Sequence, residues 1–187
     1  MRELLAEYRS VIAKHHPALS DVLRPGLPRN EVIQKLGRLP FAITDDAVEL
    51  YCWADGVEGC WINLIPIAYF MPLDEAISRF EHLLPHQAEF EKIFPQQYRQ
   101  SFPFLSDRSD GGYGFGALEQ PCYGRIISYE IHAEWTIGFN SLSDMVNAAI
   151  QGYELGLLDD EGEWDIFGFS KLVRNLYPDL YPKPDSW

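Results

Sequence analysis

The stretch from Leu39 to Gly56, LPFAITDDAVELYCWADG, constrains the fold most, because it carries both the start and the stop signals of a helix. Asp45 and Asp46 place negative charge in the first turn, where the unpaired backbone amides favour it. Apolar residues follow at spacings of three and four, and Gly56 can supply the left-handed residue that ends a helix. The stretch therefore predicts a helix from Asp45 to Ala54 with one buried face.

Other segments repeat the helical spacing of apolar residues, each with its own start or stop signal. We expect helices over Arg2–His15, over Asn30–Leu36 before Gly37, over Leu73–Leu84 before Pro85, over Leu142–Tyr153 after a Ser141 cap, and a short helix capped by Ser170. The Pro-rich end, Tyr177–Trp187, cannot form a regular helix, so it either straps across the domain or presents a recognition segment.

Strand patterns occupy the middle of the chain. We expect a strand within Cys60–Ile67, and a strand over Tyr113–Leu118 that forms a hairpin with Cys122–Ile131. Residues 128–135 alternate between apolar and polar types, which is the two-residue period of a strand with one buried face. The glycines of GGYGFG, which begins at Gly111, do not fit the spacing of a phosphate-binding loop.

The alternation places Glu130, His132 and Glu134 on one side of the expected strand, about 6 to 7 Å apart along it. Such neighbours can share an ion, but a solvated strand face explains the same pattern without a ligand. Adjacent helix positions point about 100° apart, so His15 and His16 suit one metal poorly. We therefore predict no metal site.

Three cysteines, Cys52, Cys60 and Cys122, form neither an even set nor a CxxC pair, so free thiols are expected, with a Cys52–Cys60 bridge as the alternative. The N-terminus lacks the apolar core of a signal peptide, and no apolar run is long enough for a membrane span. At 187 residues the chain is expected to be a single cytoplasmic domain.

The net charge of −13 comes from 15 Lys and Arg against 28 Asp and Glu, and it disfavours binding to nucleic acid or to anionic lipid. A cationic partner is compatible with this charge, although acidity also serves solubility alone. An acidic turn, LLDDEGEWD, follows Gly156. Charge thus limits the class of partner without naming one.

Several short motifs occur in a particular order along the chain. They are LGRLP at Leu36–Pro40, a helix closing on Tyr51, Trp53, Asp55 and Gly56, LIPIAYFMPLDEAI at Leu64–Ile77, FPF and DGG within Phe102–Gly112, and SLSDMV at Ser141–Val146. Their order resembles the SUKH superfamily, which contains fungal cell-wall-synthesis regulators and bacterial immunity proteins of toxin systems. The segment after Gly156 exceeds that pattern.

The resemblance implies a single α+β domain with a central, mostly antiparallel sheet and surrounding helices. Its family-like core is about residues 30–150, preceded by the helix at 2–15 and followed by an extension over 157–187. It also implies a non-catalytic module, without cofactor, that neutralises a toxin by binding it directly. The alternatives are an intracellular regulatory or scaffold protein and a metal-dependent hydrolase using Glu130, His132 and Glu134.

A module that binds a basic toxin domain needs exposed carboxylates beside aromatic anchors. The candidate carboxylates, at helix ends and turns where side chains reach solvent, are Asp55, Asp107 and Asp110, and the candidate aromatic anchors near carboxylates are Trp53, Tyr113 and Tyr123. Trp53 is either such an anchor or a core residue. Acidic groups are also expected to speed the encounter with a basic partner.

Overall fold

The computed structural model describes residues 1–59, 63–66, 68–93, 101–107, 111–117, 122–130, 136–159 and 162–180, without the side chains of 86–93 and Glu130. Its helices are α1 (Arg2–His15), α2 (Pro17–Val22), α3 (Arg29–Leu36), α4 (Asp45–Trp53), α5 (Leu73–Ile93), α6 (Leu142–Glu154) and α7 (Ile166–Leu176). Its strands are β1 (Leu23–Pro25), β2 (Ala54–Val57), β3 (Tyr69–Phe70), β4 (Ser101–Ser106), β5 (Gly111–Gly116), β6 (Ile126–Glu130) and β7 (Thr136–Phe139).

The strands form two antiparallel sheets. β1 pairs with β2, and the other five strands lie in the order β3-β4-β5-β6-β7, so each strand pairs with its neighbour in sequence. The predicted hairpin is present, with Tyr113 opposite Ser128. The predicted α+β class with an antiparallel sheet is confirmed.

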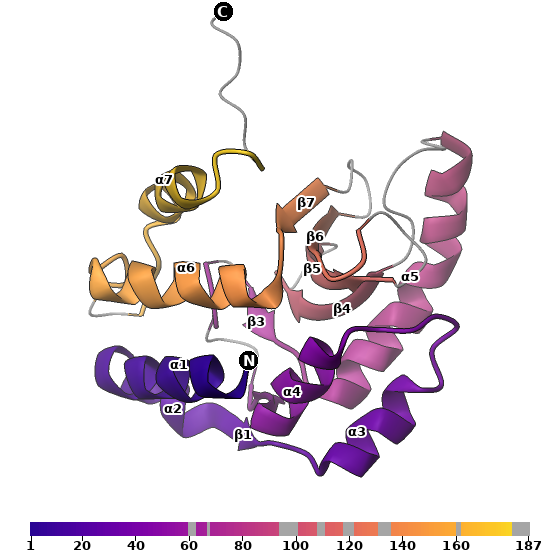
Figure 1. Ribbon diagram of the computed structural model, residues 1–187, viewed down its shortest axis with the longest axis horizontal. Helices are drawn as coiled ribbons and strands as arrows, with labels where there is room; N and C mark the ends of the chain where they lie inside the picture. Colours follow the sequence, from indigo (N-terminus) through magenta and orange to yellow (C-terminus); the bar gives the residue numbers. More distant parts are fainter. Residues whose placement is uncertain are drawn as a thin grey trace, which may run out of the picture.

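One face of the five-stranded sheet joins the main core. Phe115, Ile126 and Phe139 pack there with apolar side chains from α1, α4 and α6. On the other face, Ile127 and Tyr129 cluster with Leu83 of α5. Figure 1 shows α1 and α6 side by side, α5 running next to β4, and α7 above α6.

Local signals explain the best-predicted helices. The helices expected at Arg2–His15 and from Asp45 are confirmed, and the second ends one residue earlier than predicted, at Trp53. Ser141 caps α6 as expected, because its hydroxyl accepts a hydrogen bond from the Asp144 amide at 3.1 Å.

Two helix-stop predictions are wrong. α5 continues past Pro85 to Ile93, since Pro85 is exposed and the packing is carried by buried neighbours such as Phe80 and Leu83. Gly56 has a positive φ of 78°, but it lies inside β2, where a Cβ would meet the Pro72 nitrogen at 2.3 Å. Close backbone approach, and not helix termination, therefore requires the glycine.

Further corrections concern element starts. α7 begins at Ile166 after an Asp165 cap, so Ser170 lies within the helix and does not cap it. The strand predicted over 128–135 is wrong as one piece, because β6 and β7 run antiparallel with Ser128 opposite Thr136. The described residues 63–66 of the strand expected at 60–67 form only a bend and one isolated bridge, Ile65 to Ala68.

The strand predicted over Tyr113–Leu118 is present as β5, which begins two residues earlier than predicted, at Gly111, and ends at Gly116. A Cβ at Gly114 would lie 2.9 Å from the Phe102 carbonyl oxygen, and one at Gly116 would lie 2.2 Å from the Cys122 carbonyl oxygen. These glycines therefore admit neighbouring backbone.

Cys52 and Cys122 are free thiols, and Cys60 lies outside the described residues. Within the described ranges, no helix combines the length and the apolar character that crossing a membrane requires.

Candidate functional site

Asp55 is a structural residue. The residue is 6% exposed, its Oδ1 accepts a hydrogen bond from the Leu73 amide at 2.8 Å, and Arg24 Nη2 lies 3.0 Å from its Oδ2. The expectation that Asp55 reaches solvent is wrong, because β2 follows α4 directly and directs this carboxylate at the first turn of α5. Its charge stabilises a helix start.

Trp53 is half-buried and has both packing and surface contacts. Its ring stacks on Tyr8 with centroids 6.0 Å apart, and the Arg9 guanidinium carbon lies 5.2 Å from the ring centroid. It also lines a hollow of about 320 Å³ together with Leu5 and Leu27. Trp53 is therefore a core residue with one accessible edge.

The other predicted residues that the structure describes lie in β5 or beside its two ends. Asp107 is half-buried beside the start of β5, where its Oδ1 accepts from the Gly111 amide at 3.1 Å. Tyr123 is exposed in the turn after β5, so a six-residue strand, about 17 Å long, separates the two. Tyr113 is half-buried between them, with its ring 6.1 Å from that of Phe139, and Asp110 lies outside the described residues.

Large apolar side chains are instead exposed where α6 ends and α7 begins. Phe167 is 89% exposed and Leu155 is 64% exposed, and Ile166 beside them is also exposed. The inner face of α7 is already occupied, because Phe169 and Val173 are buried in the core. Phe167 therefore points away from the packing that holds its helix.

A short, hydrogen-bonded connection holds the end of α6 close to the start of α7. Gly156 follows α6 with a φ of 69°, and the Asp165 amide donates to the Leu157 carbonyl at 2.8 Å. Asp165 then caps α7, since its Oδ1 accepts from the Gly168 amide at 2.9 Å. The connection is thus held at both ends.

Exposed carboxylates occur on the same segments as the exposed apolar side chains. The acidic residues described at this corner are all exposed: Glu154, Asp159, Glu163 and Asp165. The sequence contains no Lys or Arg between Arg125 and Lys171 to offset them. We call Leu155, Ile166 and Phe167 with these four acidic residues the acidic-apolar patch.

The sequence predicts an acidic turn here but not the exposed apolar side chains of the patch. The available signal was the long segment without Lys or Arg that contains this turn. No comparable signal predicts that Phe167 is exposed, because residue type does not distinguish it from Phe169, which lies two residues away and is buried.

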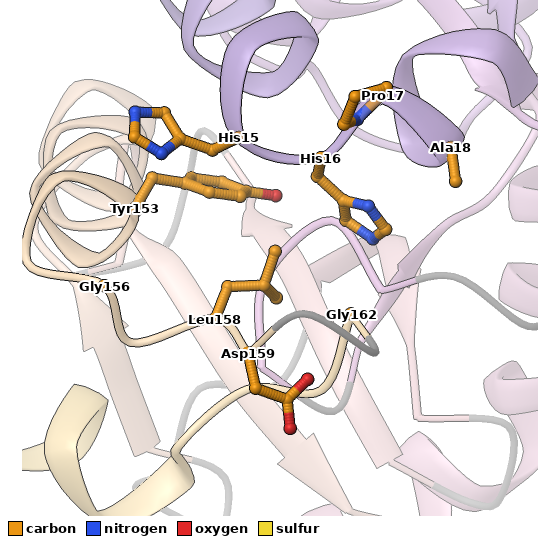
Figure 2. A pocket seen from close by; sticks show the side chains of 9 residues that line it. All are labelled: His15, His16, Pro17, Ala18, Tyr153, Gly156, Leu158, Asp159 and Gly162. Atoms are coloured by element: carbon orange, nitrogen blue, oxygen red, sulfur yellow. The ribbon is translucent and has the colours of Figure 1, made fainter.

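A cavity of about 350 Å³ opens beside the patch, between the α1–α2 junction and the loop after α6 (Figure 2). His15 and His16 line it from one side and Tyr153 of α6 from another. Gly162 closes over His16, since a Cβ there would lie 3.0 Å from His16 Cε1 and the Gly162 φ is 86°. The loop can approach the imidazole this closely only with glycine.

Burial controls the titration of two of these groups. The pKa of His16 is lowered by burial, which disfavours the charged imidazolium. Burial raises the pKa of the Tyr153 phenol well above its ordinary value. Both groups are therefore neutral near pH 7, and the cavity presents uncharged hydrogen-bonding groups.

The predicted neighbours Glu130, His132 and Glu134 lie outside the described part of the chain, which lacks the Glu130 side chain and residues 131–135. Among the side chains that the structure does describe, no three His, Cys, Asp or Glu residues are grouped so that they could hold a metal ion. The prediction about these three residues stays a prediction.

No protein-family model matches this sequence, and no curated protein matches it significantly. The resemblance to the SUKH superfamily therefore rests on the ordered motifs alone.

Proposed function

We propose that this chain is a non-catalytic protein-binding module that docks a basic protein through the acidic-apolar patch. Phe167 carries the proposal, because an aromatic ring left 89% exposed gains free energy when a partner covers it. Aromatic anchors of this kind dominate the energetics of many interfaces.

Charge selects the class of partner. Glu154 and Glu163 lie in the patch, and neither has a described Lys or Arg side chain within ion-pair distance. By contrast, Glu49 of α4 pairs with both Arg2 and Arg29. Uncompensated carboxylates attract a basic surface and raise the association rate with it.

The kind of basic partner follows from the SUKH-like motifs, which favour an immunity-type protein that neutralises a toxin by binding it. A basic toxin domain has the charge that the patch requires. The predicted regulatory role differs only in the partner, so the same docking surface serves both readings.

The test begins with capture of a partner by the tagged chain from host lysate, followed by kinetics with that partner purified. We expect Phe167→Ser to weaken affinity by about tenfold or more, because it removes a central anchor. Neutralising Glu154 and Glu163 together to Gln should slow association and remove most of its salt dependence. These two glutamates are suitable because, among the described contacts, neither side chain makes a hydrogen bond that holds the loop.

Matched controls come from another face. Ile33→Ser removes an exposed apolar side chain of α3, and Glu3→Gln with Glu7→Gln neutralises two exposed carboxylates of α1. Equal effects of the patch and control variants would refute docking at the patch. A captured partner that is harmless when expressed without this chain would refute the immunity reading and favour the regulatory one.

A further inference from the structure

The cavity of Figure 2 contains a buried hydroxyl that the fold does not use. Tyr153 is 1% exposed, and its hydroxyl oxygen has no hydrogen-bond partner among the described residues. In Figure 2 this hydroxyl points into the cavity, toward the space between His16 and Leu158. An unpaired buried hydroxyl is costly, so a ligand that pairs with it regains that free energy.

The cavity walls favour a flat organic group. The rings of His15 and Tyr153 have centroids 6.2 Å apart and are inclined by 41°, so they pack against each other and give the cavity an aromatic wall. The His16 imidazole, 9% exposed, adds one nitrogen that can accept a hydrogen bond when the ring is neutral. Such walls suit a guanidinium, which stacks on aromatic rings and donates in its own plane.

Charge and geometry argue against other ligands. Asp159 lines the cavity, and the exposed Glu154 and Glu163 are next in sequence to the lining residues Tyr153 and Gly162, so the local charge disfavours an anion. Lys14 lies one helix position, about 100°, away from His15. A bare metal ion lacks a carboxylate ligand, because Asp159 Oδ1 accepts from the Glu163 amide at 2.8 Å and its carboxylate points away from the histidines in Figure 2.

We propose that this cavity receives an arginine side chain of the basic partner, with the guanidinium between His15, His16 and Tyr153. This inference rests on the proposed function, since the partner supplies the arginine. The patch and the cavity share the loop after α6, so one partner segment can place an apolar group on Phe167 and its arginine in the cavity.

The experiment uses N-acetyl-argininamide as the probe and follows the ring resonances of His15 and His16 by NMR in the full chain. We expect saturable shifts at millimolar probe, and binding of N-acetyl-citrullinamide weaker by at least about fivefold, because its ureido group has the same shape without the charge. Tyr153→Phe should weaken the arginine probe by about threefold or more, since it removes only the hydroxyl.

Tyr51→Phe is the matched control. Tyr51 is also fully buried with an unpartnered hydroxyl among the described residues, but it does not line the cavity. We expect it to bind the probe like the parent, and thermal unfolding should show that both Phe variants are folded. The inference is overturned by any one of three results. The shifts do not saturate with the arginine probe, the citrulline probe binds with the same affinity, or Tyr153→Phe binds the arginine probe with the affinity of the parent.

The two proposals fail separately. Phe167→Ser is expected to keep parental binding of N-acetyl-argininamide, because Phe167 does not line the cavity. If the small probe does not bind while the captured partner still depends on Phe167, the cavity inference is wrong and the docking proposal stands. If the probe binds while the partner is indifferent to Phe167, docking at the patch is wrong.

Discussion

Replacing Asp55 tests whether this predicted binding residue instead holds the fold. Asp55→Ala removes the acceptor of the Leu73 amide, the hydrogen bond at 2.8 Å that begins the 21-residue helix α5. A hydrogen bond to a charged group contributes about 1.5–3 kcal/mol, and its loss leaves the amide unsatisfied. Carboxylate charge at a helix start adds about 0.3–1 kcal/mol.

Arg24 contributes little to this sum, because its side chain is 45% exposed and exposed ion pairs contribute only about 0–1 kcal/mol. We therefore expect Asp55→Ala to lower the free energy of unfolding by about 3 kcal/mol. Asp55→Asn keeps an acceptor oxygen and loses the charge, so it should cost about 1 kcal/mol.

Urea unfolding at pH 7 measures both free-energy changes. Glu58→Gln, at an exposed residue directly after β2, is the control, and it should change the free energy of unfolding by no more than about 0.5 kcal/mol. Hydrogen exchange adds a local readout. The increase in exchange rate from the parent to Asp55→Ala should be larger for the amides of Leu73 and Asp74 than for the amides of α6. A parental stability for Asp55→Ala, or uniform exchange changes, would show that this carboxylate does not hold α5.

The remaining predictions concern single contacts. Ser141→Ala should cost about 1 kcal/mol in urea unfolding, because it removes the α6 cap, whereas exposed Ser170→Ala should not. Tyr177→Phe should also cost about 1 kcal/mol, since the Tyr177 hydroxyl donates to the Asp144 carbonyl at 2.9 Å; an unchanged midpoint contradicts this. Burial lowers the folded-state pKa of His16, so below its ordinary pKa of 6.5 the unfolded chain binds more protons. Stability should therefore decrease as the pH is lowered through this range, and His16→Gln should reduce that decrease in urea unfolding.

Local chemistry predicted the helices whose ends are set by their own residues. Ser141 precedes an apolar stripe and caps it, and Asp45 begins a helix whose buried side carries Ala47 and Leu50. The prediction that Pro85 ends its helix is wrong, because a proline costs a helix one internal hydrogen bond and a well-packed helix tolerates that loss.

The site depended on contacts between distant parts of the chain, which spacing does not encode. Asp55 follows a helix, where exposure is common, but it lies against Leu73, eighteen residues away. The cavity joins His16 to Tyr153 across the packing of α1 on α6. Periodicity assigns a residue to a face of its own helix, and only tertiary packing decides what that face meets.

The edges of the five-stranded sheet limit how a partner can attach. β3 contains two residues and β7 contains four, so each described edge offers few backbone donors and acceptors to an incoming strand. Strand addition needs a longer register of main-chain hydrogen bonds to give useful affinity. Recognition by this domain should therefore depend on side chains, so that surface substitutions can change the choice of partner. The short edge strands should at the same time disfavour edge-to-edge pairing of two copies of the sheet.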